Sequence, residues 1–465
     1  MELEKAALAC GAKILHFSPA VLTGAASDSR NVRRGDLFTA IRGERADGHD
    51  FARTAVSNGA SAVLAQRDPF QGEPLSPVLL VEDSVKALGC ISHAWRKEFK
   101  GKVIGITGTA GKTTTKELLA HILSLHGKTA RTPMNLNSQI GMPISIMAAD
   151  GDEDFWVMEA GISHPEDMDE LGPILEPDIA IILNAGTGHS LGLGDRGTAY
   201  YKARLLAHRK KGGTALVCAD YDDLAREARM LCPETVFFSA QGREVPYRVA
   251  YRGLDEKARG QYRLWLEEKE VDVTCALSGA YAAENILAAA AAAHLSGLSC
   301  QEIKHGVETA LFPSQRFARH EIPGWTVIDD TYNANPLSAS RMIEASAELA
   351  RGKAFVCVMG AMGELGALSA EEHRKLGRIL AGTCEALFWF GSHREDIQKG
   401  LEEASFSGAF FPLSSLEEFL PAITCWEKRY RENDSREGLI LFKGSRVNRM
   451  ERLVNLFMEQ KNHAL

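Results

Sequence analysis

A short glycine-rich stretch near residue 110 combines the residue types that bind phosphate. Residues 105–115 read GITGTAGKTTT, in which Gly108 and Gly111 precede Lys112 and Thr113. Glycines let backbone N–H groups approach phosphate oxygens, a lysine reaches the β- and γ-phosphates, and a threonine hydroxyl ligates Mg²⁺. The general phosphate-loop pattern has another glycine five residues before Gly111, and this sequence has isoleucine there. The stretch therefore predicts a nucleotide site of a narrower kind.

The flanking residues predict the strand and helix that a phosphate-binding loop requires. Residues 102–107 (KVIGIT) form a short apolar run typical of a buried strand. Residues 113–127 carry leucine and isoleucine on one helical face and end at Gly127. The N–H groups of such a turn and the positive end of the helix dipole together attract an anion. The alternative is a glycine-containing turn with a solvent-exposed lysine, which the order strand, loop and helix disfavours.

Composition excludes several classes of function. The chain has 465 residues, 45% of them hydrophobic and 25% charged, which is ordinary for a globular protein. A net charge of −8 without a basic block argues against nucleic acid and against an anionic membrane surface. No window of the sequence has eighteen consecutive apolar residues, and the first fifteen residues lack the pattern of a signal peptide. The nine cysteines include no C-x-x-C pair, so we expect free thiols and a cytoplasmic protein.

Alternating apolar runs and helical patterns predict an α/β fold with three domains. Strands are expected at 61–66, 77–83 and 102–107, and a helix at 84–99. Further strands are expected at 154–161, 178–186 and 213–220, followed by a helix at 285–297, which predicts a mostly parallel sheet. From about residue 314 the alternation restarts, with strands at 325–330, 353–360, 385–392 and 438–445. We therefore expect a small α/β domain over 1–100, an ATP-binding domain over 101–313 and a doubly wound, Rossmann-like domain over 314–465.

The loop, read as Gly-Thr-x-Gly-Lys-Thr after a strand, resembles the ATP loop of the Mur ligases and folylpolyglutamate synthetases. Other segments resemble the Mur ligase family in particular. They are MNLNSQIGMP (134–143), VMEAGISHPEDM (157–168), PDIAIILNAGTGH (177–189), AYYKARLL (199–206), GAYAAENILAAAAAA (279–293), VIDDTYNANPLS (327–338), MGAMGELG (359–366) and LFKGSRVNRME (441–451). The run over 27–64 resembles the family's UDP-sugar-binding module. The resemblance covers nearly the whole chain.

The resemblance implies an ATP-dependent carboxylate–amine ligase. ATP phosphorylates a carboxylate, and an amine then displaces phosphate from the acyl phosphate. The three C-terminal segments resemble the branch of the family whose substrates are UDP-MurNAc-tripeptide and D-alanyl-D-alanine (D-Ala-D-Ala), which serves peptidoglycan synthesis. The folylpolyglutamate branch is disfavoured, because those enzymes lack a UDP-binding module. A monomer is expected, although no motif determines the oligomeric state.

The same resemblance assigns residues to this chemistry. The catalytic set is Lys112, Glu159, His189 and Lys202. Two Mg²⁺ ions are expected, with Thr113, Glu159, His189 and Lys202, the last as a CO₂-derived carbamate, among their ligands. ATP is expected to contact Gly108, Thr109, Ala110, Gly111, Lys112, Thr113, Thr114, Asn285, Arg316, Asp330, Tyr332 and Asn333. The UDP-substrate is expected at Ser27, Asp28, Ser29, Arg30, Asn135 and Asn137.

Several positions depart from the family pattern, and two alternative functions remain open. Met134 and Ser138 differ from the pattern of their segment, and the Glu that the family has shortly after the histidine corresponding to His189 is absent. Arg204 stands where the family has Glu, and Tyr281 where it often has His. Asp28 also fits a turn-capping role. The first alternative function is a related ligase with a different amino acid or carboxylate. The second is a nucleotide-sensing module, which Glu159, His189 and Lys202 disfavour because sensing needs no second metal site.

Overall fold

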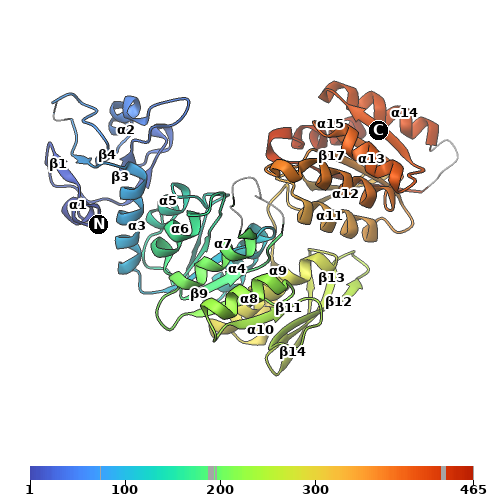
Figure 1. Ribbon diagram of the computed structural model, residues 1–465, viewed down its shortest axis with the longest axis horizontal. Helices are drawn as coiled ribbons and strands as arrows, with labels where there is room; N and C mark the ends of the chain where they lie inside the picture. The colour runs from blue at the N-terminus through green and yellow to red at the C-terminus, as the bar shows by residue number, and fades with distance from the viewer. Residues whose placement is uncertain (74, 187–192, 194–195, 431–435, 464–465) are drawn as a thin grey trace.

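The structure is a computed structural model that describes residues 1–73, 75–186, 193, 196–430 and 436–463. Within these residues three sheets follow one another along the chain, each with its own helices (Figure 1). The predicted α/β fold with three domains is confirmed. We call them the N-terminal, central and C-terminal domains, after their sheets.

The N-terminal domain is a five-stranded sheet in the order β1-β5-β4-β3-β2, parallel except for β1. Helices α1 and α3 pack on one face of this sheet and α2 on the other. Its strands are β1 (Lys13–Leu15), β2 (Gly24–Ala26), β3 (Asp36–Thr39), β4 (Ala62–Ala65) and β5 (Val78–Leu80), and its helices are α1 (Leu3–Cys10), α2 (Ala52–Ser57) and α3 (Ser84–Glu98).

The central domain is a nine-stranded sheet in the order β14-β13-β12-β11-β10-β9-β6-β8-β7. Its strands are β6 (Lys102–Thr107), β7 (Thr129–Arg131), β8 (Phe155–Glu159), β9 (Ile179–Ile182), β10 (Thr214–Cys218), β11 (Val236–Ser239), β12 (Tyr247–Leu254), β13 (Gly260–Leu266) and β14 (Lys269–Cys275). Its helices are α4 (Lys112–Ser124), α5 (Gly141–Met147), α6 (Asp167–Leu175), α7 (Gly197–Ala203), α8 (Asp222–Leu231), α9 (Ala280–Leu295) and α10 (Cys300–Thr309).

Helices cover both faces of the parallel part of this sheet. Apolar side chains of α4, α9 and α10 form the core on one face, and those of α5, α6, α7 and α8 form the core on the other. Strands covered on both sides are continuously apolar rather than alternating, as β6 and β9 are. Helix α9 contains the alanine run 288–293, which is fully buried, and alanine has the highest helix propensity.

Three strands at one edge of the central sheet were not predicted. β12 is parallel to β11, but β12, β13 and β14 form an antiparallel meander. Their inward residues alternate with outward polar ones, as in a strand with one solvated face. The sheet is therefore mostly parallel, as predicted, with an antiparallel extension. Helix α9 begins at Ala280, five residues before the predicted start.

The C-terminal domain is a six-stranded sheet in the order β15-β16-β20-β17-β18-β19, parallel except for β15. Its strands are β15 (Ala318–Ile322), β16 (Trp325–Asp330), β17 (Ala354–Gly360), β18 (Ala386–Phe390), β19 (Ala409–Leu413) and β20 (Gly438–Lys443). Its helices are α11 (Pro336–Leu349), α12 (Ser369–Ala381), α13 (Arg394–Glu403), α14 (Phe419–Tyr430) and α15 (Glu451–His463). Two cores on opposite faces make this a doubly wound sheet.

Two absences concern the described residues alone. No helix among them is long and apolar enough to span a bilayer. All nine cysteines lie among these residues as free thiols, five of them buried.

Candidate active site

The glycine-rich stretch forms a tight loop between β6 and α4. Gly111 has a φ of +82°, and a Cβ added there would lie 2.1 Å from the side-chain oxygen of Asn285. Thr115 in α4 donates a hydrogen bond to that oxygen (3.3 Å). Gly111 is therefore required for backbone conformation and for space. The close approach also brings the predicted nucleotide residue Asn285 against the loop.

Asn184, two residues beyond β9, braces the loop from the other side. Its side-chain oxygen accepts from the backbone N–H of Ala110 (2.8 Å), and its side-chain amide donates to the carbonyl of Ala110 (3.1 Å). The backbone N–H of Thr109 also donates to the carbonyl of Asn184 (3.2 Å). Asn184 was not among the predicted site residues. Its position just after a strand, within a segment that resembles the family, was the available signal.

Two lysines converge on one loop carbonyl. Lys112 Nζ and Lys202 Nζ donate to the carbonyl oxygen of Gly108 at 2.7 and 3.1 Å. Lys202, on α7, is fully buried. Burial lowers the pKa of Lys202 well below its ordinary value, and the Lys112 cation lowers it further. Desolvation lowers the pKa of Lys112 as well, against the opposing effect of Glu159. Two ammonium groups within one small volume call for compensating anionic charge.

Oxygen donors suited to Mg²⁺ lie beside this loop. Glu159 is the last residue of β8, and its carboxylate accepts from Thr113 Oγ1 (2.8 Å) and from the side-chain amide of Asn137 (2.7 Å). Strands β6 and β8 are parallel neighbours, so their carboxyl ends bring the loop and Glu159 together. Carboxylate and hydroxyl oxygens are hard ligands of the kind Mg²⁺ prefers. The donor set therefore fits the predicted ion, and the predicted ligand His189 lies outside the described residues.

A cavity of about 510 Å³ extends from the loop to the C-terminal domain. Along its wall lie Thr109, Ala110, Gly111, Lys112, Thr113, Thr114, Asn135, Asn137, Glu159, Asn285, Arg316, Asp330, Tyr332 and Asn333. The structure thus brings together most of the residues predicted for ATP and metal, from two domains. Gly108, which is part of the loop, and Lys202, which contacts its carbonyl, do not line this cavity.

The C-terminal side of this cavity is organised by a buried ion pair. Lys443 Nζ, at the end of β20, pairs with Asp330 at the end of β16 (2.5 Å) and donates to the carbonyl of Asn333 (2.9 Å). Asp330 also accepts from the backbone N–H of Phe317 (3.1 Å). The guanidinium of Arg316 lies 3.9 Å from the centre of the Tyr332 ring. The predicted nucleotide residues of this domain therefore form one connected group.

A second cavity, of about 770 Å³, adjoins the first. Arg316 and Arg446 line it, and both guanidiniums lie against the Tyr332 ring, that of Arg446 at 5.7 Å. Glu364 lines both cavities and has a φ of +62°, an uncommon conformation for a residue with a side chain. The second cavity is therefore lined by two guanidinium groups and one carboxylate where it adjoins the first cavity.

The residues predicted for UDP do not all come together. Asn135 and Asn137 line the first cavity, whereas Ser27, Asp28, Ser29 and Arg30 lie in the N-terminal domain and line neither cavity. Asp28 accepts from the backbone N–H of Arg30 (3.0 Å) and pairs with its guanidinium (2.6 Å). These hydrogen bonds hold the pKa of Asp28 down at about 2. Asp28 thus caps a turn, and this hydrogen bond does not test its predicted contact with UDP.

Arg204 and Tyr281, which both depart from the family pattern, lie in different surroundings. Arg204 pairs with Asp169 (2.9 Å) on the helical layer and does not line either cavity. Tyr281 lines the first cavity and contacts the ring of Phe317 edge-on, 5.4 Å between centroids. Burial raises the pKa of Tyr281 well above its ordinary value. Tyr281 therefore contributes a neutral aromatic wall to the cleft.

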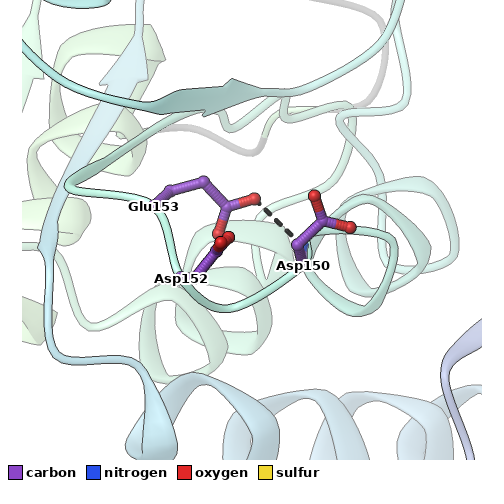
Figure 2. A group of neighbouring side chains, drawn as sticks. All are labelled: Asp150, Asp152 and Glu153. Atoms are coloured by element: carbon purple, nitrogen blue, oxygen red, sulfur yellow. Dashed lines mark hydrogen bonds between the residues drawn. The ribbon is translucent and has the colours of Figure 1, made fainter.

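One acidic cluster among the described residues has the spacing of a metal site, namely Asp150, Asp152 and Glu153 (Figure 2). Its oxygens already have partners. Glu153 accepts from the backbone N–H groups of Asp150 (2.9 Å) and Gly151 (2.8 Å), and Lys128 pairs with both aspartates. The cluster precedes β8, at the opposite end of that strand from Glu159. These carboxylates therefore stabilise a turn, and we do not assign a metal to them.

Comparisons with known proteins agree along the whole chain. Three family models match: "Mur ligase family, catalytic domain" over residues 21–96, "Mur ligase middle domain" over 106–293, and "Mur ligase, glutamate ligase domain" over 315–446. The UDP-N-acetylmuramoyl-tripeptide–D-alanyl-D-alanine ligase of Synechocystis is 34% identical over 370 residues, 78% of each chain. That of Escherichia coli is 30% identical over 452 residues, 94% of each chain.

Solved structures of ligases from the same family superpose on this chain over nearly its whole length. MurF from Acinetobacter baumannii superposes with a TM-score of 0.87 at 30% identity, covering 98% of both chains. MurF ligase from Thermotoga maritima in complex with ADP superposes with a TM-score of 0.82 at 28% identity, covering 95% of this chain and 98% of that one.

Proposed function

Because this chain belongs to the Mur ligase family, we propose that it joins D-Ala-D-Ala to the C-terminal carboxylate of UDP-MurNAc-tripeptide at the expense of ATP. The product is the UDP-MurNAc-pentapeptide of peptidoglycan synthesis. The observation that carries the proposal is the cleft in which Lys112, Thr113 and Glu159 of the central domain face Arg316 and Tyr332 of the C-terminal domain. The similarity to ligases of this name over most of both chains supports the choice of substrates.

The loop binds the triphosphate. Backbone N–H groups of residues 111–113 surround the phosphates, while those of Thr109 and Ala110 remain bonded to Asn184. Lys112 exchanges its bond with the Gly108 carbonyl for the terminal phosphates. Thr113 and Glu159 would hold Mg²⁺, which would neutralise phosphate charge during the transfer. Asn137 orients the Glu159 carboxylate. Arg316 supplies cationic charge from the second domain, and Tyr332 and Tyr281 supply aromatic surface for the nucleoside.

The chemistry then proceeds in two displacements. An oxygen of the tripeptide carboxylate attacks the γ-phosphorus, the bond to the bridging oxygen breaks, and ADP leaves. The amine of the dipeptide attacks the carbon of the acyl phosphate, and inorganic phosphate leaves with the electron pair of the C–O bond as the amine loses a proton. Positioning and charge stabilisation supply most of the catalysis in phosphoryl transfer, and the cleft between the domains limits access of water to the acyl phosphate.

Lys202 carries a carbamate in the working enzyme. Its Nζ lies against the same carbonyl as that of Lys112, where an ammonium would repel a second cation. A carbamate replaces this positive charge with one negative charge shared by two oxygens, which would suit a second Mg²⁺ together with His189. The full burial of Lys202 protects the carbamate from acid and bulk water.

The three domains divide the substrates among them. Residues 1–100 bind the UDP-sugar part of the nucleotide peptide through Ser27, Asp28, Ser29 and Arg30, residues 101–313 bind ATP, and residues 314–465 bind the dipeptide. The second cavity is the place for the dipeptide, because its guanidiniums suit a carboxylate and Glu364 suits an ammonium. The enzyme works as a monomer in the cytoplasm.

Release of phosphate from ATP tests the proposed function. With purified protein and Mg·ATP, phosphate release is expected only when UDP-MurNAc-tripeptide and D-Ala-D-Ala are both present, with formation of the pentapeptide. L-Ala-L-Ala serves as the control dipeptide. Release that needs a different amine or carboxylate would favour a related ligase. Nucleotide binding without release under any of these conditions would overturn ligation.

A further inference from the structure

Arg341 crosses from the C-terminal domain to the central domain. It lies on α11, and its guanidinium bonds both carboxylate oxygens of Glu284 on α9, at 2.8 and 3.4 Å. It also donates to the hydroxyl of Tyr221 (2.6 Å), which itself donates to Glu284 (3.0 Å). The side chain of Glu284 is only 3% exposed and that of Arg341 only 16%. This is a largely buried, bidentate ion pair between two domains.

Glu284 depends on this arginine for its charge balance. Among the residues that the structure describes, its other hydrogen-bond partners are the hydroxyl of Tyr221 and the side-chain amide of Asn184, both uncharged. An ionised carboxylate that is buried without a counter-ion is strongly disfavoured. Undocking of the C-terminal domain would therefore leave Glu284 unbalanced.

Glu284 in turn orients Asn184. An ionised carboxylate only accepts hydrogen bonds, so the nitrogen of the Asn184 amide must face Glu284 (2.5 Å). This leaves the amide oxygen for the backbone N–H of Ala110, which it accepts at 2.8 Å. Rotation of the amide by half a turn would set two acceptors against each other at Glu284 and two donors against each other at Ala110. The carboxylate thus decides which atoms of Asn184 meet the phosphate loop.

We propose that Arg341, Glu284 and Asn184 form a relay through which docking of the C-terminal domain holds the phosphate loop in its nucleotide-binding shape. Arg341 is a positioning residue in this relay, since it lines the cleft but acts on the loop through two other side chains. Asn335, at the start of α11, adds a direct contact from its side-chain amide to the loop carbonyl of Thr109 (3.4 Å). The inference rests on the proposed function only in requiring that the loop binds ATP.

The full-length Arg341→Met variant tests the relay, because methionine keeps length without charge. The dissociation constant for Mg·ADP is expected to rise roughly tenfold, the effect of losing about one charged hydrogen bond. The KM for ATP should rise similarly, and the KM for D-Ala-D-Ala should change less than threefold. Arg319→Met is the matched control. It removes another contact between these domains, from Arg319 to the carbonyl of Lys257 (3.2 Å), which does not lead to the loop. Arg341→Lys should recover part of the affinity.

The Arg341→Met substitution is repeated in the Glu284→Gln variant to test whether the loss of Mg·ADP affinity depends on Glu284. There, Arg341→Met is expected to cost less than threefold in further affinity, because the charge that the arginine balanced is gone. An unchanged affinity in Arg341→Met, an equal loss in Arg319→Met, or independent losses that multiply in the double variant would each overturn the relay. If Arg341→Met does not fold, Arg341→Lys and Glu284→Gln are compared in its place. Wild-type protein that fails to bind Mg·ADP would contradict the proposed function instead.

Discussion

At the scale of single residues, the main feature of the site is that two lysines and a glutamate lie close together. Lys112 and Lys202 share the carbonyl of Gly108, and the carboxylate of Glu159 lies nearby with Thr113 and Asn137 on its two oxygens. A buried lysine whose pKa is lowered this far is costly to keep charged, so its place beside Lys112 in the site calls for a chemical use. Carbamylation is the use that we propose.

The Lys202→Ala variant should lower turnover by about a hundredfold or more, a loss comparable to that of other fixed charge-stabilising groups. Short carboxylic acids such as acetate should restore part of the activity, since they supply the missing oxygens. Phosphate release in the presence of both substrates measures both effects. The control is Lys210→Ala, which removes an exposed lysine paired with Asp178 (2.9 Å). Loss without rescue would contradict the carbamate, and unchanged turnover would contradict any role of Lys202 in the reaction.

At the scale of elements, the loop that follows β17 depends on a buried histidine of α12. His373 Nε2 accepts from the backbone N–H of Met362 (3.0 Å), while Nδ1 donates to the carbonyl of Ser369 (2.7 Å). This pattern needs the neutral ring. The pKa of His373 is lowered to about 4, chiefly by desolvation and also by the stacked ring of His393, 4.3 Å away. The hydrogen bond to Ser369 and the carboxylates of Asp396 and Glu372 act in the opposite direction. The loop so held carries Glu364 into both cavities.

Stability should therefore decline in acid because of His373. Its pKa is lower in the folded chain than its ordinary value of about 6.5, so the contribution is fully present above pH 6.5 and is lost as the pH falls toward 4. The slope from this group is up to about 1.4 kcal/mol per pH unit. Urea unfolding at several pH values between 7.5 and 5 measures it. His373→Gln should flatten the slope and the exposed control His305→Gln should not, and equal slopes in all three proteins would refute this assignment.

At the scale of the whole molecule, the cleft belongs to two of the three domains. The loop and Glu159 come from the central sheet, and Arg316, Asp330 and Tyr332 come from the entry to the C-terminal sheet. Figure 1 shows the N-terminal domain on the far side of the central domain from the C-terminal one. A nucleotide in the cleft therefore bridges the central and C-terminal domains and leaves the N-terminal sheet untouched.

Saturating Mg·ADP should stabilise these two domains selectively. At a hundred times the dissociation constant, the free energy of unfolding should rise by about 2.7 kcal/mol. Hydrogen exchange should slow around residues 102–160 and 316–335 but not in strands β2 to β4 of the N-terminal domain. Mg·AMP serves as the control nucleotide, because it differs from Mg·ADP only in lacking the second phosphate. Equal protection of all three sheets, or protection confined to the central domain, would contradict a site shared by these two domains.

The sequence by itself determined the features that depend on neighbouring residues. Glycine spacing, the apolar run before it and the helical pattern after it predicted the loop between β6 and α4, and the bounds of β6 and β16 were predicted as observed. Apolar runs between helical patterns predicted three α/β domains. These signals are local because backbone conformation, helix propensity and strand burial act over a few residues. The resemblance then grouped distant motifs, and the structure places the side chains predicted for ATP from several of them, including Lys112, Asn285 and Arg316, along one cavity.

Tertiary structure alone decided the pairings between distant residues. Asn184 meets Ala110 across 74 positions, and Arg341 meets Glu284 across 57. Neither contact follows from spacing, since each depends on which strands are neighbours and on how two domains dock. The antiparallel strands β12 to β14 were missed for a related reason. Their stability depends on pairing with one another and with β11 at the edge of the sheet, which a local pattern does not show. The spacing of glycine, lysine and threonine made the loop recognisable from the sequence. Only the packing of distant strands and domains determined that Asn184 and Glu284 hold it in place.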